Sequence, residues 1–371
     1  MKIRYANISV ALAFAGSVAH AQSSVTLYGI VDVGPIYVSN EKGQRLIGVA
    51  SGDQQGNRFG FKGRENLGGG TAAIFVLENG FNANTGALGQ GGRLFGRQAY
   101  VGLSNGRYGK LTLGRQYDTN YDYMADTGAA KLFAGNGAHV SDNDNLFGSV
   151  RFQNALKYTS PDFGGFSFAT MYSASDMAGG FSDNRAFSAT VGYVHGMLKL
   201  AAGYLKMDRP NSADNSNGAT TDFPSLFKTS AVGSQTAPID KQQIYALTAT
   251  YAFGPTSENL VYSHTNYKYF DGSHLRLDNA EANGTWHITP AVSLGLGYIF
   301  TAGHYDVINR SPRWHQIDIG LDYSLSKRSD IYAFLIGQRA VGSSNNAAIF
   351  NVPTSSSKTQ AEAEFGVRHF F

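Results

Sequence analysis

Cysteine is absent from all 371 residues of the sequence, and this absence excludes a disulfide framework and a thiolate metal site. Proline is scarce, with nine residues. Beyond the N-terminal segment, no stretch approaches the run of roughly eighteen apolar residues that a membrane-spanning helix needs. The 30 basic and 27 acidic residues nearly balance, so the charge gives no indication of a nucleic-acid partner.

Residues 1–21 have the pattern of a secretory signal. Lys2 and Arg4 supply the basic start, ISVALAFAGSV is the apolar run, and the sequence AHA ends it in a small-x-small cleavage pattern. The apolar run is too short to span a bilayer, which disfavours a membrane anchor. We expect cleavage, export, and a mature chain that begins at or near Gln22.

Glycine, tyrosine and phenylalanine are abundant, with 45, 21 and 24 residues, as is typical of many strands with glycine turns and aromatic ends. Apolar and polar residues alternate along many segments, and this period of two indicates strands with one wet and one apolar face. Sixteen segments are expected as strands: residues 23–34, 57–67, 71–81, 95–105, 110–116, 151–161, 166–175, 185–195, 198–208, 241–253, 258–269, 275–289, 292–305, 314–326, 330–339 and 358–371.

The connections between these segments alternate between short turns and long polar loops. Short turns at one rim and long loops at the other are typical of an outer-membrane barrel. In hydrocarbon every backbone N–H and C=O needs a protein partner, so a sheet can cross only if it closes on itself. Sixteen strands leave an open bore, whereas about eight fill it with side chains. The pattern therefore predicts an all-β fold, a sixteen-stranded antiparallel transmembrane β-barrel.

Residues 117–150 lack the alternation and are crowded with Asp, Asn, Gly and Tyr. A loop of this length counts against the neighbouring strands in a compact soluble domain. If the strands close a wide barrel, a loop folded into the bore is the expected way to narrow it. We therefore expect an aqueous channel that is constricted by residues of this segment.

The parity of the alternation directs five basic residues toward the polar face: Arg58, Lys62, Arg64, Arg151 and Lys157. A Lys or Arg that faced lipid at the midplane would cost roughly 2–4 kcal/mol, so a bore-facing direction is favoured.

Three acidic residues of the long segment, Asp118, Asp122 and Asp126, fall four apart. On a helical turn this spacing would align them along one edge. Acids that face cations across water would create a transverse field in the bore. Solvated loop acids without such a role are an equally good interpretation of the spacing.

Several segments resemble the Gram-negative general porins of the beta-proteobacterial type. The similarity runs along the whole mature length in the right order, and the segments that carry it are SSVTLYGIVDVG, FGFKGRENLGGGTAAIFVLENGF, FGRQAYVGLSNGRYGKLTLGRQYD, RFQNALKYTSPDFGGFSF and the terminal GVRHFF. The resemblance implies that residues 22–371 form one porin barrel whose third external loop folds inward. It implies a homotrimer in the cell outer membrane, in contact with lipid and lipopolysaccharide, that passes small hydrophilic solutes and ions. Many members prefer anions, and no cofactor or metal is expected.

The resemblance also assigns residues to the constriction. The basic wall would contain Arg58 and Arg151, with Arg97 and Arg115 as further candidates and Glu78 beside them. Arg97 and Arg115 share the parity of neighbouring apolar residues, so strict alternation would direct them outward. A β-bulge, or a position beyond the hydrocarbon, would reconcile the two interpretations. At the chain end, the resemblance implies that the terminal aromatic Phe371 serves as an assembly signal.

Other functions receive less support from the sequence. Residues 141–145, SDNDN, are rich in oxygen ligands but lack the glycine and distal glutamate of a calcium loop. HExxH and GxSxG motifs are absent. An outer-membrane hydrolase would need a nucleophile or base near His at the rim, and sixteen strands exceed what a small catalytic barrel requires. A substrate-specific channel for sugars or anionic solutes is the main alternative, and aromatic residues along the bore, drawn from Tyr117, Tyr121, Tyr123 and Phe133, would support it. A secreted sandwich is the third class.

Overall fold

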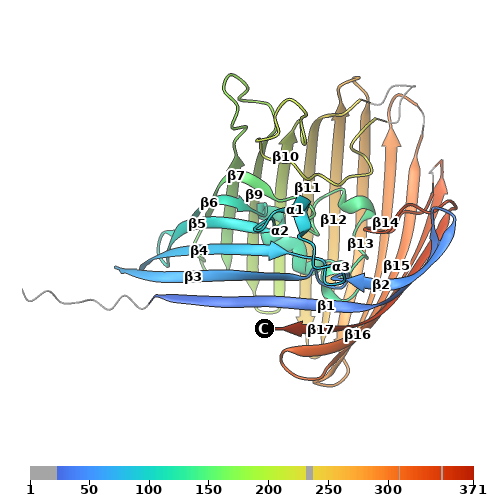
Figure 1. The fold of residues 1–371 in the computed structure, drawn as a ribbon, viewed down its shortest axis with the longest axis horizontal. Coiled ribbons are helices and arrows are strands. Elements are labelled where there is room, and N and C mark those ends of the chain that lie inside the picture. Colours follow the sequence, from blue (N-terminus) through green and yellow to red (C-terminus); the bar gives the residue numbers. More distant parts are fainter. Residues whose placement is uncertain (1–22, 231–236, 309, 344–345) are drawn as a thin grey trace, which may run out of the picture.

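Antiparallel strands make up most of the chain (Figure 1). The computed structural model describes residues 23–230, 237–308, 310–343 and 346–371, and the expected signal at residues 1–21 lies outside this range. The strands are β1 (Ser24–Glu41), β2 (Gln44–Ser51), β3 (Arg58–Gly68), β4 (Thr71–Gly80), β5 (Gln98–Asn105), β6 (Gly109–Gln116), β7 (Phe152–Thr159), β8 (Phe166–Ser173), β9 (Arg185–His195), β10 (Leu198–Asp208), β11 (Ile239–Phe253), β12 (Thr256–Tyr269), β13 (His274–His287), β14 (Val292–Tyr305), β15 (Pro312–Ser324), β16 (Ser329–Gly342) and β17 (Thr359–Phe370).

The sheet closes because β1 pairs with both ends of the strand order. One edge of β1 pairs with β17, and the other edge pairs first with β3 and then with β2. β2 and β3 follow one another along the same neighbour, so the seventeen strands of the described residues fill sixteen positions around the barrel. The predicted sixteen-stranded antiparallel barrel is confirmed.

One predicted loop is wrong. The expected strands 23–34 and 57–67 leave the residues between them as a polar loop. In the structure, β1 instead continues to Glu41, and the chain turns at Lys42 and Gly43 into β2. Both turn residues have positive φ, as a two-residue hairpin turn requires. β2 does not show the alternation of apolar and polar residues, because apolar residues occupy both of its faces: Ile47 is exposed and Ala50 is buried.

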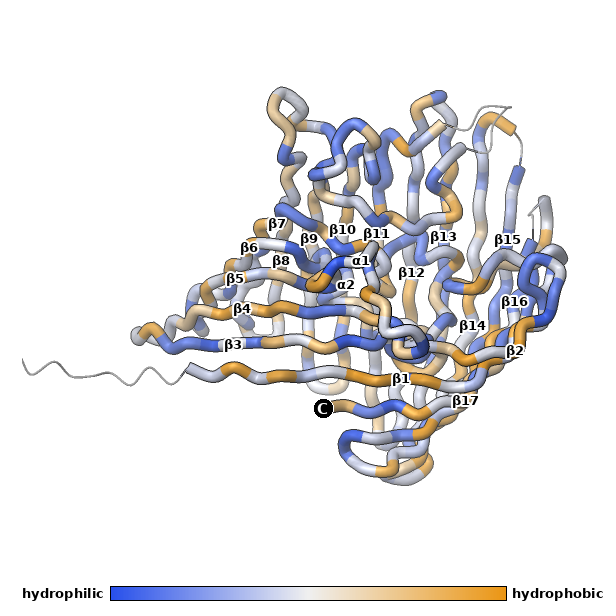
Figure 2. The backbone as a smooth tube through the Cα atoms, in the orientation of Figure 1, coloured by the Kyte–Doolittle hydropathy of each residue, from blue (hydrophilic) through white to orange (hydrophobic). Residues whose placement is uncertain are grey.

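The outer face of the barrel is apolar. Val101 lies opposite Leu113 across β5 and β6. Leu296 lies opposite Ile319 across β14 and β15. All four side chains are exposed, and Figure 2 shows hydrophobic positions alternating with hydrophilic ones along the strands. Exposed apolar surface that continues around the whole sheet is what contact with lipid requires.

The alternate side chains of the same strands are polar and buried. Ser263 of β12, Asn279 of β13 and Gln316 of β15 are each at most 2% exposed. Asn279 donates to Ser263 and to Asn143 of the segment between β6 and β7, and Gln316 accepts from Gln338 of β16. The alternation expected from the sequence is therefore present on both faces.

Helical structure is confined to short turns. These are α1 (Gly89–Gly92), α2 (Thr119–Met124), α3 (Ala129–Leu132) and the 3-10 turns η1 (Ala125–Thr127) and η2 (Val140–Asp142). In the residues that the structure describes, no helix has both the length and the apolar character needed to cross a membrane. All of these turns except α1 lie in the segment between β6 and β7, close to the predicted 117–150.

The C-terminus completes the closure of the barrel. The Phe371 amide donates to the Gly29 carbonyl at 3.1 Å, and the Gly29 amide donates to the Phe371 carbonyl at 3.0 Å. Gly29 has no room for a side chain, because an added Cβ would lie 2.2 Å from the Phe371 ring. The last residue is therefore packed against the first strand.

Deleting Phe371 should reduce the yield of folded barrel. The deletion removes two backbone hydrogen bonds at the closing seam, worth about 1–3 kcal/mol together. The heat-modifiable band on a gel measures the folded fraction. Phe371→Tyr keeps the backbone and an aromatic ring, and it should fold normally; equal folded yields for the deletion and Phe371→Tyr would contradict the prediction.

Candidate functional site

The segment between β6 and β7 is tied to the polar face of distant strands. Gln242 of β11 and Tyr267 of β12 donate to the Asn143 carbonyl at 2.8 and 3.1 Å. Glu281 of β13 accepts from the Ala129 amide at 2.7 Å. Asn283 donates to the Thr127 carbonyl at 2.8 Å. These bonds come from strands far along the chain, so the segment crosses from β6 toward β11–β13.

Two stacked tyrosines at the start of this segment organise a group of cations. The rings of Tyr117 and Tyr121 lie 3.9 Å apart at 16°. Arg97 and Arg151 both donate to the Tyr117 hydroxyl, at 2.8 and 3.1 Å. Lys131 of α3 donates to the Tyr121 hydroxyl at 2.9 Å. Three cations from separate parts of the chain are therefore held around one aromatic pair.

Glu78 is the acid of this group. It is the first of the three buried residues that end β4, and it pairs with Arg97 through an Nε–Oε1 contact of 2.7 Å. Its other oxygen accepts from the Tyr28 hydroxyl at 2.9 Å. One carboxylate thus fixes the position of Arg97 but cannot balance the charge of the whole cluster.

A cavity of about 400 Å³ opens onto these cations. Its charged lining residues are Arg58, Arg97, Lys131 and Arg151, with Asp222 as the acid. Asp222 is itself held by Arg115, through an Nη2–Oδ2 contact of 2.6 Å. The cavity, referred to below as the arginine cavity, therefore carries an excess of positive charge.

The pKa values of Lys131 and Tyr117 are shifted by burial and by the positive charges around them. Burial, and then the positive charges of Arg58, Arg97 and Arg151, lower the pKa of Lys131 to about 8. Burial alone would raise the pKa of Tyr117, but Arg151 and Arg97 outweigh it and lower that pKa to about 8. The lowered pKa of Tyr117 shows that negative charge is favoured at its hydroxyl, and that of Lys131 shows that burial and the neighbouring arginines disfavour a further positive charge.

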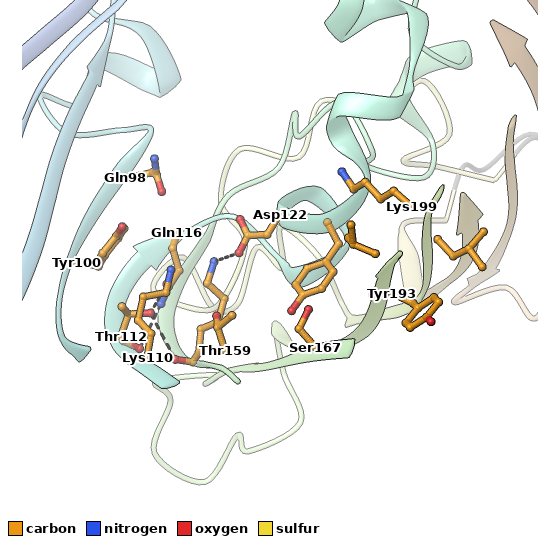
Figure 3. A pocket seen from close by; sticks show the side chains of 15 residues that line it. Gln98, Tyr100, Lys110, Thr112, Gln116, Asp122, Thr159, Ser167, Tyr193 and Lys199 are labelled. Carbon is orange, nitrogen blue, oxygen red and sulfur yellow. Dashed lines mark hydrogen bonds and ion pairs between the residues drawn. The ribbon is translucent and has the colours of Figure 1, made fainter. Parts of the chain in front are cut away.

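A second cavity, of about 460 Å³, is lined by three lysines, Lys110, Lys157 and Lys199. Figure 3 shows Asp122 pointing toward this group, with its interaction drawn as a dashed line. The partner of Asp122 is Lys157, at 2.6 Å, and Lys157 also donates to the Tyr117 carbonyl at 2.9 Å. Tyr117 therefore bonds to lining residues of both cavities: its hydroxyl accepts from Arg97 and Arg151, and its carbonyl accepts from Lys157.

The basic residues predicted from sequence are distributed unevenly. Arg58, Arg97 and Arg151 converge on the arginine cavity, whereas Lys157 lines the second cavity. Lys62 and Arg64 lie further along β3 and are exposed. They pair with residues at the beginning of β1, so they lie away from the cluster.

The conflict over Arg97 and Arg115 has a structural solution. The register between β6 and β7 shifts between Gly114 and Gln116, and Gly114 has φ of 129°. This bulge turns Arg115 inward, where it is 7% exposed. Arg97 precedes the first residue of β5, so strand parity does not govern its direction.

The three acids spaced four apart have different partners. Asp118 is fully buried and caps α2 by accepting from the amides of Asn120 and Tyr121. Asp122 pairs with Lys157, and Asp126 pairs with Lys199 at 2.7 Å. Asp122 and Asp126 therefore each contact a lysine, whereas Asp118 contacts backbone amides of its own helix. An Asp directly before a helix is a common N-cap, and this signal was available in the sequence.

Sequence analysis missed Lys131, Asp222 and Lys199. Asp222 lies in the long loop between β10 and β11, and Lys131 lies in a segment without periodicity. Neither residue has a parity that a strand pattern could give, because loop paths depend on tertiary contacts. The aromatic path expected for a sugar channel is also not formed by Tyr117 and Phe133, which are 4% and 8% exposed.

Comparison with known proteins gives consistent matches. The family model described as Gram-negative porin matches residues 9–339. An outer membrane porin protein of Bordetella pertussis is 32% identical over 86% of this chain and 90% of its own length. The solved anion-selective porin from Comamonas acidovorans is 23% identical, with a TM-score of 0.75 over 94% of this chain and all of that chain. OmpT of Vibrio cholerae, solved in a trimer form, is 17% identical, with a TM-score of 0.69 over 94% of this chain and 99% of that chain.

The two solved structures share the fold of this chain. The family match and the Bordetella relative span most of its length and agree with the closed barrel, its apolar outer face and its polar inner face. The chain therefore belongs to the Gram-negative porin family, and it is an outer-membrane channel and not an enzyme.

Proposed function

We propose that this chain is a general diffusion porin that passes small hydrophilic solutes and ions and prefers anions. The observation that carries the proposal is the convergence of Arg58, Arg97, Arg151 and Lys131 on one cavity with a single acid, Asp222, in its lining. An excess of fixed positive charge concentrates anions and excludes cations within about a Debye length, which is about 10 Å at 0.1 M salt.

The segment between β6 and β7 is the proposed constriction. Its bonds to β11, β12 and β13 support a path across the bore, and the two cavities with cationic linings support a narrowed passage lined by cations. Solutes would cross between the segment and the arginine side of the wall. Its dipolar lining would favour hydrophilic over apolar solutes.

The proposed assembly is a homotrimer of mature chains that begin near Gln22. The trimer form of the Vibrio cholerae structure supports the oligomeric state, and the anion selectivity of the Comamonas acidovorans porin supports the ion preference. Lipid would cover the apolar outer face, and lipopolysaccharide would cover it in the outer leaflet.

Planar-bilayer recording in a potassium chloride gradient tests the proposal. We expect discrete conductance steps and a reversal potential of the sign that chloride permeation gives. The preference should weaken as salt is raised, because screening shortens the reach of the fixed charges. Potassium preference at all salt concentrations would overturn the anion proposal, and the absence of conductance steps would overturn the channel itself.

The anion preference should fall as the pH rises through about 8. Lys131 then loses its positive charge and Tyr117 gains a negative one, because both have pKa values of about 8. Reversal potentials over about one pH unit either side of 8 measure the change. The double variant Lys131→Gln with Tyr117→Phe has neither titrating group, so its reversal potential should change less than that of the wild type over this interval. An equal pH response in both proteins would contradict the assignment.

A further inference from the structure

Three carboxylates from two distant parts of the chain meet at the inner wall beside the arginine cavity. Asp53 lies in the turn between β2 and β3, and Glu362 and Glu364 lie on β17. Each carboxylate has an oxygen that lies within 4.8 Å of an oxygen of each of the other two. Gln54 and Gln55, which follow Asp53, line the arginine cavity.

Two oxygens of this group are buried without a partner. Glu362 is 1% exposed and Glu364 is 4% exposed, and Oε2 of each has no hydrogen-bond partner among the described residues. A buried carboxylate oxygen without a donor costs more free energy than a neutral orphan. This observation is independent of the clustering and indicates that something outside the chain completes the site.

The hydrogen bonds that the site does have are few. Asn136 donates to Glu362 Oε1 at 2.9 Å and to Asp53 Oδ2 at 3.2 Å. The Tyr332 hydroxyl donates to Glu364 Oε1 at 2.6 Å. Among the ion pairs of the described residues, none involves Asp53, Glu362 or Glu364. The two buried carboxylates and the half-buried Asp53 therefore lie together without an ion-pair partner to balance them.

We propose that Asp53, Glu362 and Glu364 bind a divalent cation, with calcium preferred over magnesium. Calcium takes carboxylate oxygens at about 2.3–2.6 Å in flexible geometry, so two opposite ligands lie roughly 4.8 Å apart. Magnesium demands near-octahedral geometry at about 2.0–2.1 Å and keeps several of its waters, so it is usually held by one or two carboxylates and not by three. The unpartnered Oε2 atoms of Glu362 and Glu364 supply the free lone pairs.

The cation would brace the constriction. Asn136 belongs to the segment between β6 and β7, and it bonds two of the three carboxylates. The same segment packs tightly on the turn of Asp53, because a Cβ added to Gly135 would lie 2.2 Å from the Asp53 carbonyl oxygen. A cation held by Asp53 and β17 would therefore join the β2–β3 turn, the wall and the constricting segment. This consequence rests on the proposed function, whereas binding itself does not.

Calorimetric titration of the full-length mature protein tests the site. The protein is refolded in detergent without lipopolysaccharide, freed of metal with a chelator, and titrated with calcium chloride or magnesium chloride. We expect one calcium site per chain and weaker magnesium binding. Glu362→Gln should lower the calcium affinity at least about tenfold, since even the loss of an outer partner of a metal ligand has an effect of about this size. Glu65→Gln, which changes an exposed acid on β3, should leave the affinity unchanged.

A measurement of unfolding temperature separates a loss of calcium binding from a loss of folding. Calcium should raise the unfolding temperature of the wild type and of Glu65→Gln, but not that of Glu362→Gln or Glu364→Gln. Heat-modifiable mobility shows whether each variant is folded. If the wild type binds no calcium, or if folded Glu362→Gln binds it equally well, the proposal is overturned. Neither calorimetry nor the unfolding temperature measures ion flow. The calcium proposal can therefore fail or succeed independently of the anion-channel proposal.

Discussion

Replacing both Arg58 and Arg151 by glutamine is expected to shift the reversal potential in a salt gradient strongly toward cation preference. Both guanidinium groups line the arginine cavity, and Arg151 also lies over the Tyr117 ring, with Cζ 5.0 Å from its centroid. A unit charge about 6 Å from a passing ion contributes about 0.7 kcal/mol in water, a factor of about three in the local ion concentration. Two such changes multiply to about tenfold for each ion.

Arg64→Gln is the matched control for this double variant. Arg64 lies on the same strand as Arg58, six positions along, and is exposed. At about 3.3 Å for each residue of a strand, roughly 20 Å separates the two, which is about twice the Debye length at 0.1 M salt. The control should keep the wild-type reversal potential. An unchanged potential in the double variant, or an equal shift in Arg64→Gln, would contradict the location of the constriction at the arginine cavity.

The barrel itself could be predicted from sequence because one rule governs all of its strands. Lipid on one side and water on the other impose an alternation on each strand, and segments such as 292–305 show it clearly. The same rule fails where the environment differs. β2 was missed because Ile36 and Val38 of its partner strand pack inward against Val352, so this hairpin has apolar residues on the face that is polar elsewhere.

The candidate site could be predicted only in part. Parity gave Arg58 its direction, and the family resemblance supplied Arg97, which parity alone would have rejected. Lys131 could not be found because it lies in a loop whose path is set by contacts with β11–β13. The carboxylate site could not be predicted either, because it too depends on contacts between distant parts of the chain. Asp53 and Glu362 are far apart in the sequence, and only barrel closure brings β17 beside the first hairpin.

Replacing His139 by glutamine is expected to loosen the segment between β6 and β7, the proposed constriction. His139 Nδ1 contacts Asp144, and its Nε2 lies 3.0 Å from Glu281 Oε2 on β13. All three side chains are buried, so the variant leaves two carboxylates without their cation. Breaking a buried ion pair by removing one partner costs about 3–5 kcal/mol. Hydrogen exchange should show reduced protection of the amides between Ala125 and Asn145.

Lys199→Gln provides the matched control. It removes another ion pair of the same segment, with Asp126 at 2.7 Å, but these side chains are 33% and 66% exposed. An exposed pair contributes about 0.2–1 kcal/mol, so the control should change the protection little. Equal protection in His139→Gln and Lys199→Gln would contradict the role of His139 as the buried anchor.

The anchor should also weaken at alkaline pH. Burial alone would lower the pKa of His139, but Asp144 and Glu281 outweigh it and raise that pKa well above 6.5. A raised pKa means that the stabilisation is complete below pH 6.5 and is lost as the pH rises through the raised value. Burial and Asp144 raise the pKa of the neighbouring Asp142 to about 7, so the contribution of Asp142 to stability is lost as the pH rises from 3.8 to about 7.

Above pH 7, the difference in protection between wild type and His139→Gln therefore reports on His139. This difference should shrink as the pH rises, because the wild type loses the charge that the variant already lacks; a difference that stays constant up to strongly alkaline pH would contradict a protonated His139.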